Sequence, residues 1–153
     1  CLFVGFTTLI FGILLGVVDH LKPQQENVTL TYKKSFFIGM AQAMALLPGV
    51  SRSGICMTMG RYFMLKRTDA ARFSFLLSIP TIIGAAVLTG YKLHAQGLPY
   101  MSQEILLAIG ASFMFGLMAI HFMMMWLQKS NFIPFVVYRL ILGCILLYMG
   151  LVN

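Results

Sequence analysis

Long apolar runs decide what this chain can fold into. They lie at about 2–18, 72–91, 103–127 and 134–152, and each is long enough to cross the ~30 Å hydrocarbon core of a membrane as a helix. Only 10% of the residues are charged, whereas an ordinary soluble domain has about a quarter. Because lipid offers no hydrogen bonds to the backbone, such runs form helices. The sequence therefore predicts an all-α, polytopic transmembrane helical bundle, with residues 1–153 forming a single membrane domain.

A further apolar stretch, at about 36–65, is broken in its middle. At about 1.5 Å per residue, Phe36–Leu47 reaches only about 18 Å, which is short of a membrane span. Pro48 and Gly49 then stop the helix, and a second short helix can run from Ser51 to about Leu65. The segment is either one broken span or a re-entrant hairpin that returns to the side it came from.

The distribution of positive charge favours the hairpin. In that arrangement one side of the membrane carries eight basic residues and the other only Lys92, whereas a spanning segment would divide the same charges almost evenly. The eight are Lys22, Lys33, Lys34, Arg61, Lys66, Arg67, Arg72 and Lys129. Cytoplasmic loops are the ones that carry an excess of Lys and Arg. The hairpin is therefore predicted to enter from the cytoplasmic side, and the C-terminus is predicted on the outer side of the membrane.

The predicted tip of the hairpin, "LPGVSRSG", has the chemistry of an anion site. An arginine at bilayer depth costs about 2.5–3.5 kcal/mol on insertion scales, so Arg52 needs a compensating interaction. If Ser51 or Ser53 begins the second helix, free backbone N–H groups and the positive dipole end point at the break. Gly49 and Gly54 would let the backbone approach a ligand. A group of hydroxyls, amides and a guanidinium suits phosphate. In the alternative interpretation Ser51 only caps the second helix and Arg52 pairs with backbone carbonyls.

The remaining polar residues carry weaker signals. Gln42 either lines the cavity at the tip or hydrogen-bonds a neighbouring helix. Arg139 lies about one turn into the last predicted span, so its side chain can extend to the cytoplasmic face, and a functional role is the lesser alternative. Asp19 and Asp69 are expected in loops. None of the four acidic residues lies near bilayer depth, so the chain holds an anion-recognition element without the base or metal ligands that phosphate hydrolysis requires.

The net charge of +7 does not indicate nucleic-acid binding, because the basic residues sit at the ends of apolar runs, where membrane topology places them. The expected partners are membrane lipids and an anion, with phosphate preferred over carboxylate. Whether the protein forms a homo-oligomer is left open.

Three blocks of the sequence resemble the undecaprenyl-diphosphate phosphatase family, also called bacitracin resistance proteins. They are "GMAQAMALLPGVSRSG", "AARFSFLLSIP" and "FIPFVVYRLILG", and they occur in the family's order. The family motif Pro-Gly-x-Ser-Arg-Ser-x-x-Thr matches at Pro48, Gly49, Ser51, Arg52 and Ser53. Its threonine position is taken by Cys56, which puts one hydroxyl contact in doubt.

The resemblance implies an integral enzyme of the bacterial inner membrane that converts undecaprenyl diphosphate, a polyprenyl diphosphate lipid, to the monophosphate carrier. It implies two inverted-topology halves, each with a re-entrant helix pair, of which this chain resembles the second. A divalent metal, Mg²⁺ or Ca²⁺, would be held mainly by the first half, which is expected upstream of Cys1, so no metal ligand is assigned in this chain.

The resemblance also assigns roles at the tip. Arg52, Ser51 and Ser53 would be catalytic, and Pro48, Gly49, Gly54 and Gln42 would surround the substrate phosphates. Two other functions stay open: a transporter or flippase for an anionic lipid, since broken helices of inverted repeats also serve transport, and a structural membrane subunit, which the cost of burying Arg52 disfavours.

Overall fold

A computed structural model describes residues 1–21, 28–96 and 103–152, and every regular element in these ranges is helical. The elements are α1 (Leu2–Leu21), α2 (Tyr32–Ala43), the short 3₁₀ helix η1 (Met44–Leu46), α3 (Arg52–Tyr62), α4 (Arg67–Ala95), α5 (Gln103–Lys129) and α6 (Ile133–Val152). Four of these, α1, α4, α5 and α6, are long and apolar enough to cross a membrane. The predicted fold class, an all-α multi-pass membrane protein, is confirmed, and each spanning helix extends beyond its predicted bounds.

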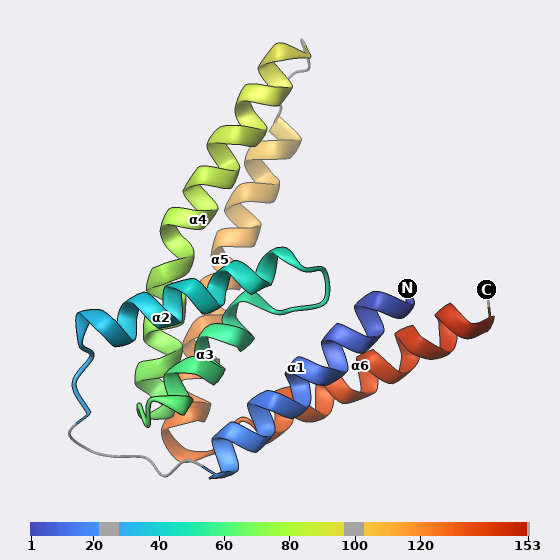
Figure 1. The fold of residues 1–153 in the computed structure, drawn as a ribbon. Coiled ribbons are helices and arrows are strands. Elements are labelled where there is room, and N and C mark those ends of the chain that lie inside the picture. The colour runs from blue at the N-terminus through green and yellow to red at the C-terminus, as the bar shows by residue number, and fades with distance from the viewer. Residues whose placement is uncertain (22–27, 97–102, 153) are drawn as a thin grey trace.

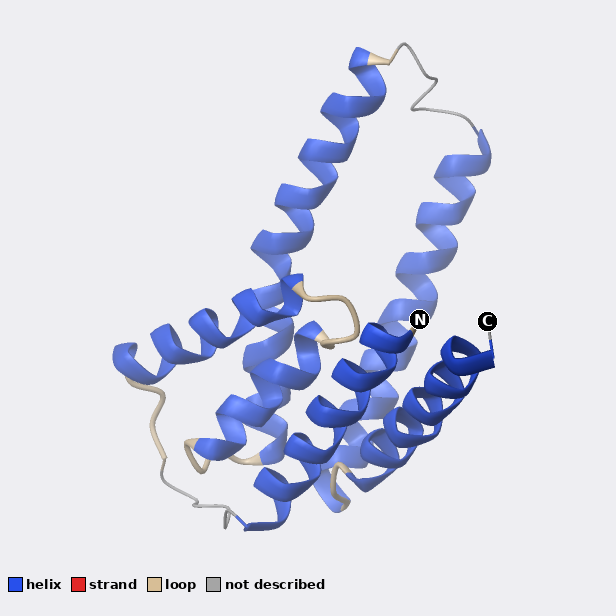
Figure 2. Cartoon of the chain, turned by 45° about the vertical axis from the view of Figure 1, so that its right-hand side comes forward, coloured by secondary structure: helices blue, strands red, loops and turns tan. Residues whose placement is uncertain are grey.

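Helices α1 and α6 lie side by side and antiparallel, so that the two ends of the chain meet (Figures 1 and 2). Glycines allow the close approach. A Cβ on Gly5 would lie 2.8 Å from Leu147 Cδ2, and one on Gly143 would lie 2.6 Å from Leu9 Cγ. Small residues play this role between membrane helices, where van der Waals packing drives association. The tip between α2 and α3 rests against the α1–α6 pair.

Helices α2 and α3 form the predicted hairpin, with α3 packed between α1 and α4. Figure 1 shows that α3 runs back toward the end of the molecule at which α1 finishes and α4 begins. The second half-helix of the hairpin is shorter than predicted at its C-terminal end. Helix α3 ends at Tyr62, and Met64 adopts a positive φ of 65° before α4 starts. Whether this helix pair re-enters the membrane, as the charge distribution favours, stays a prediction.

An ion cluster, which we call the Asp19 cluster, fixes that return. Asp19 is 6% exposed, and its Oδ1 accepts hydrogen bonds from Arg61 Nε at 2.8 Å and Arg67 Nε at 2.9 Å. Its Oδ2 lies 3.4 Å from the backbone N of Phe132, which links α5 to α6. Arg61 also donates from Nη1 to the carbonyl of Leu65 at 2.7 Å. The carboxylate at the end of α1 thus contacts the end of α3, the start of α4 and the α5–α6 connection.

The Asp19 cluster corrects the expectation that Asp19 and Asp69 lie in loops. Asp19 belongs to the last turn of α1, and Asp69 lies in the first turn of α4. Arg67, expected in a polar turn, is the first residue of α4. Loops were expected because these residues are charged. Pairing with the buried Arg61 and the partly exposed Arg67 allows a charged carboxylate inside a helical bundle.

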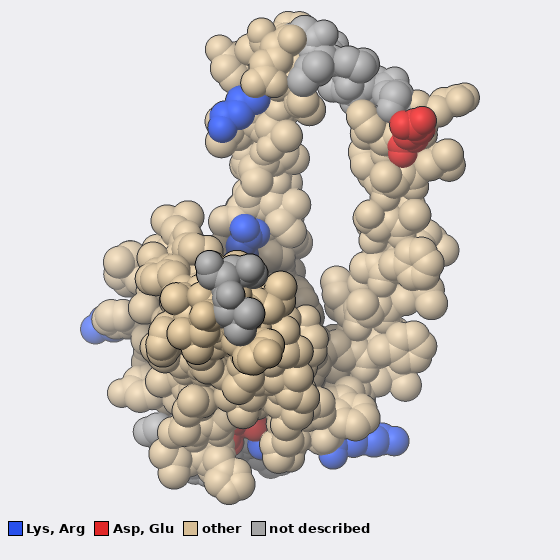
Figure 3. All heavy atoms as spheres, turned by 90° about the vertical axis from the view of Figure 1, so that its right-hand side faces the viewer, with Lys and Arg blue, Asp and Glu red and all other residues tan. Residues whose placement is uncertain are grey.

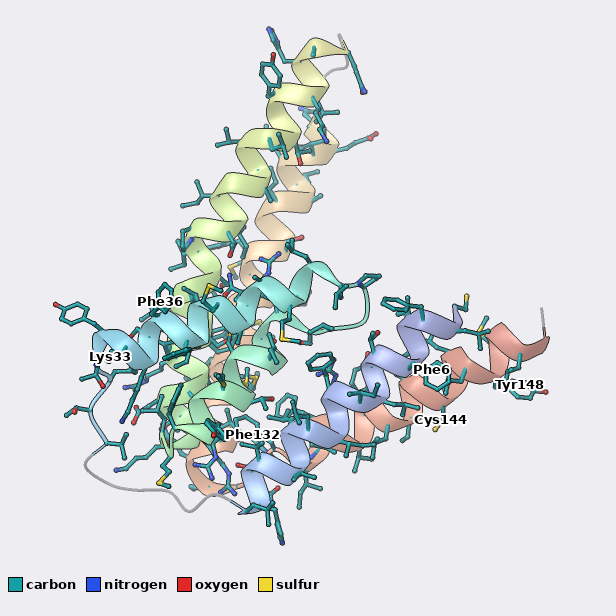
Figure 4. The ribbon with its side chains drawn as sticks, in the orientation of Figure 1. Phe6, Lys33, Phe36, Phe132, Cys144 and Tyr148 are labelled. Carbon is teal, nitrogen blue, oxygen red and sulfur yellow. The ribbon has the colours of Figure 1, made fainter. Side chains whose placement is uncertain are left out.

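Helices α4 and α5 form a long pair that extends well beyond the hairpin (Figures 1 and 2). Leu127 is the one buried residue among those described in α5. Charged atoms are sparse on the face shown in Figure 3, which is covered almost wholly by uncharged residues. Exposed apolar side chains such as Phe6 and Tyr148 line the α1–α6 pair, while Phe132 is buried where the helices converge (Figure 4). Such surfaces suit lipid contact.

Candidate anion-binding site at the hairpin tip

The turn between the two half-helices depends on one glycine. Leu47 leaves η1 in an extended conformation, and Gly49 then adopts φ 93°, a region that other residues rarely enter. A Cβ on Gly49 would collide with the Thr7 hydroxyl and approach the carbonyl oxygen of Val4 to 2.7 Å. The tip can therefore lie against α1 only because this position has no side chain.

Side chains from α1 and α6 hold the tip in place. Thr7 Oγ1 donates to the carbonyl of Pro48 at 2.7 Å, and Thr8 Oγ1 lies 3.3 Å from the carbonyl of Gly49. From α6, Arg139 Nη2 donates to the same Gly49 carbonyl at 2.9 Å. Backbone carbonyls in an apolar region need such partners. The Pro48 and Gly49 carbonyls of the non-helical tip therefore have side-chain partners.

Two serines mark the start of α3. Ser51 is its N-cap residue, and its Oγ accepts a hydrogen bond from the backbone N–H of Gly54 at 3.2 Å. The Ser51 and Ser53 hydroxyls lie 3.2 Å apart. The first turn of a helix presents backbone N–H groups and the positive end of the dipole. Hydroxyls and amides therefore gather at one point, which favours an anion.

The serines open on a pocket of about 430 Å³, which we call the serine pocket. Its polar side chains are those of Thr8, Ser51, Ser53, Tyr138 and Arg139, and the other side chains are apolar. The apolar members are Val4, Leu15, Val50, Met57, Met123, Phe132, Phe135, Leu142 and Leu146. A site that is apolar over most of its wall and polar at one end suits an amphipathic ligand.

Arg52 lies outside the serine pocket. It is exposed and lines a separate pocket of about 270 Å³ together with Gln42 and Thr81, which we call the Arg52 pocket. The sequence suggested that the serine hydroxyls, the amides and the Arg52 guanidinium converge on one point. In this structure consecutive residues of α3 face two pockets, because successive helical positions point about 100° apart. Joint contact of Arg52 and the serines with one ligand stays a prediction.

Gln42 hydrogen-bonds a neighbouring helix, as one of its alternatives predicted, while its contact with substrate phosphates stays a prediction. It lines the Arg52 pocket, and its Nε2 lies 3.4 Å from Thr81 Oγ1 on α4. Its Oε1 accepts from the thiol of Cys56, which is 1% exposed, at 3.4 Å. Cys56 therefore contacts α2 rather than the serine pocket. Thr58 donates to the carbonyl of Gly54 within α3, and Pro48 is exposed and contributes to neither pocket.

Arg139 is the residue that sequence reasoning undervalued. It does not extend to the end of the bundle but is 8% exposed and reaches the hairpin tip, where it lines the serine pocket. The available signal was the cost of a charge within an apolar span, the same argument that singled out Arg52. Snorkelling explains that cost only for a side chain with a free path to water, and the hairpin closes that path.

No group of three or more His, Cys, Asp or Glu side chains in the described ranges could hold a metal ion. Asp19 is engaged with Arg61 and Arg67, and Glu26 lies outside the described residues. The side chains around the serine pocket are hydroxyl, guanidinium and apolar groups, which do not form a site for Mg²⁺ or Ca²⁺. The described residues therefore do not fit a metal.

A bundle with four helices long and apolar enough to cross a membrane, and with a broken helix pair packed among them, defines a multi-pass membrane protein. The chain belongs to the bacitracin resistance protein family, since the model of that family, described as bacitracin resistance protein BacA, matches residues 1–145.

Named relatives agree with this assignment. The chain is 45% identical over 151 residues to undecaprenyl-diphosphatase 1 of Rhodospirillum rubrum, covering 96% of this chain and 54% of the relative. It is 43% identical over 148 residues to an undecaprenyl-diphosphatase of Alteromonas mediterranea, covering 96% and 56% respectively. A relative of the same name from Marinobacter nauticus is 41% identical over 141 residues, covering 92% and 53%. The chain thus spans about half the length of the curated relatives it matches.

Proposed function

We propose that the complete protein hydrolyses undecaprenyl diphosphate to undecaprenyl phosphate and inorganic phosphate, which recycles the lipid carrier for peptidoglycan synthesis and confers bacitracin resistance. The observation that carries the proposal is the serine pocket, in which hydroxyls and a buried arginine stand at one end of an apolar wall. Its chemistry matches a lipid-linked phosphate, and the relatives are named for that activity.

The residues of this chain bind and stabilise charge in the proposed reaction. The Ser51 and Ser53 hydroxyls and the first-turn amides of α3 donate to phosphate oxygens, and the apolar wall receives the first isoprene units. Arg52, from the neighbouring pocket, stabilises charge that develops on the phosphoryl oxygens in the transition state. Oriented donors in a region with little water contribute most to such a reaction, because they need no reorganisation as the charge forms.

The attacking group and its base are proposed to lie in the part of the relatives' length that this chain does not span. The described residues place no carboxylate at the serine pocket, and hydrolysis near neutral pH needs a base or a metal. We therefore expect residues 1–153 alone to release no phosphate from a polyprenyl diphosphate, with or without Mg²⁺, Mn²⁺ or Ca²⁺. Arg52→Ala in the same fragment gives the background. Metal-dependent turnover that this substitution abolishes would contradict the assignment.

The proposed setting is the bacterial inner membrane, with the Asp19 cluster end toward the cytoplasm and the C-terminus outside. The charge distribution supports this orientation. Cysteines introduced at Lys66 and Lys129 should be labelled by an impermeant reagent from the cytoplasmic side, and one introduced at Gln96 from the outside. Labelling of Lys66 and Gln96 positions from the same side would contradict it.

The deciding experiment measures inorganic phosphate released by the full-length protein from a polyprenyl diphosphate in detergent. Release that Arg52→Ala abolishes supports hydrolysis. If the protein instead moves the lipid across a vesicle membrane and releases no phosphate, the transporter or flippase alternative replaces the proposal.

A further inference from the structure

Arg139 uses only half of its guanidinium. The side chain is 8% exposed, and Nη2 donates to the carbonyl of Gly49 at 2.9 Å. Nη1 is buried and has no hydrogen-bond partner among the described residues. A buried donor left unpaired destabilises the folded state, and more so when it is charged. The bond to Gly49 explains why one nitrogen is at the tip, but it does not explain the second.

The unpaired nitrogen lies against the start of α3. A Cβ on Gly54 would lie 2.7 Å from Arg139 Nη1, so the absence of a side chain at Gly54 makes room for the guanidinium. Ser51 and Ser53 line the same pocket as Arg139. The same Cβ would lie 3.3 Å from Ser51 Oγ, so the second guanidinium nitrogen and a serine hydroxyl flank one point at the start of α3.

We propose that Arg139 is a phosphate-binding residue of the serine pocket, where Nη1 donates to a phosphoryl oxygen that the Ser51 and Ser53 hydroxyls also contact. The structure would thus place an arginine in each of the two pockets at the start of α3, Arg139 beside the serines and Arg52 in its own. The identity of the phosphoryl compound as a lipid diphosphate rests on the proposed function. The phosphate contact itself rests on the unpaired nitrogen and the pocket.

The test measures binding of labelled inorganic phosphate to the full-length protein by equilibrium dialysis, which does not depend on turnover. We expect Arg139→Lys to weaken binding about tenfold, because a lysine that replaces the Gly49 contact has no second, fixed donor. Arg139→Met should weaken it further. Competition by a polyprenyl diphosphate then shows whether the lipid uses the same site.

A matched control is Arg61→Lys, which alters a buried arginine of the Asp19 cluster, away from the pocket. It should lower the melting temperature yet leave phosphate affinity within about twofold, since charge-assisted contacts act locally. If Arg139 merely braced the tip, Arg139→Lys would retain phosphate affinity. If the Arg139 variants fail to fold, Gly54→Ala tests the same point by displacing Nη1, and it should also weaken binding.

The proposal is overturned if wild-type protein shows no saturable phosphate binding, or if affinity is unchanged in Arg139→Lys or, where that variant does not fold, in Gly54→Ala. Failure of the proposed function would look different: phosphate would bind through Arg139 while no phosphate is released from the lipid diphosphate.

Discussion

Two arginines are buried at opposite ends of α3, and they differ in how many of their nitrogens have hydrogen-bond partners. Arg61, near the C-terminus of the helix, is 1% exposed and meets a carboxylate, two backbone carbonyls and no pocket wall. Arg139 reaches the N-terminus of α3 from α6, meets one carbonyl, and leaves a nitrogen unpaired beside a pocket.

This difference in hydrogen bonding distinguishes an arginine that stabilises the fold from one that is available to bind a ligand. A buried cation whose three nitrogens are all hydrogen-bonded, as those of Arg61 are, contributes to structure, since removal of its partner leaves an uncompensated charge. A buried cation with an unused donor is a cost that folding alone does not recover. The Asp19 cluster therefore belongs to the framework, and the hairpin tip is where a ligand would complete the hydrogen bonding.

The largest expected effect comes from removing the carboxylate of the Asp19 cluster. Asp19→Ala leaves Arg61 buried without a counter-charge, which should cost about 3–5 kcal/mol of unfolding free energy. Denaturation of the full-length protein in detergent would measure it. Asp69→Ala is the control, because Asp69 interacts with a helix end at about 0.3–1 kcal/mol. Equal losses in the two variants would show that the cluster is not a framework element.

Gly49→Ala should have the next largest effect, and at the other end of α3. Forcing φ 93° on an alanine costs about 1–3 kcal/mol, and the new methyl also displaces the tip from Thr7 and Val4. We expect loss of most phosphate release, with the spanning helices still inserted. Gly84→Ala on α4 is the control, since a Cβ there meets nothing within 4 Å. Full activity in Gly49→Ala would mean that the turn geometry is unimportant.

The sequence predicted the elements that depend on local signals. Apolar runs gave the spanning helices, and Pro48-Gly49 gave the break, because helix length and turn conformation follow from neighbouring residues. The Asp19 cluster escaped prediction because the partners of Asp19 lie 42, 48 and 113 residues away along the chain, and a charged residue by itself predicts a loop. Arg139 escaped because its environment depends on how α6 packs beside the hairpin. Pairings between distant segments are set by packing, which no local pattern encodes.

Arg52→Lys tests the exposed arginine of the tip. The lysine keeps the charge but loses the planar fork, so we expect at least a tenfold loss of kcat/KM, or about 1.4 kcal/mol. Because Arg52 is exposed, the melting temperature should not change. Arg72→Lys, at an exposed arginine of α4, should keep full kcat/KM. Near-normal turnover by Arg52→Lys would remove Arg52 from the phosphate contacts and leave Arg139 as the arginine of the site.

The smallest expected effect tests how firmly α1 positions the tip. Thr7 has one hydroxyl proton, and the nearest acceptor to its Oγ1 is the Pro48 carbonyl oxygen at 2.7 Å. Thr7→Val keeps the shape of the side chain and removes the hydrogen-bond donor, so the free energy of unfolding should fall by about 1 kcal/mol. If the hairpin tip is displaced as a result and the same ~1 kcal/mol is lost from transition-state stabilisation, kcat/KM falls about fivefold.

Thr89→Val, on the exposed face of α4, is the matched control and should change neither quantity. Helix α1 supplies carboxylate bonding at the Asp19 cluster and only hydroxyl bonding at the tip, so the tip should be the more easily displaced of the two ends. If Thr7→Val destabilised the protein as much as Asp19→Ala, the tip would be as much a part of the framework as the Asp19 cluster. The distinction drawn from Arg61 and Arg139 would then fail.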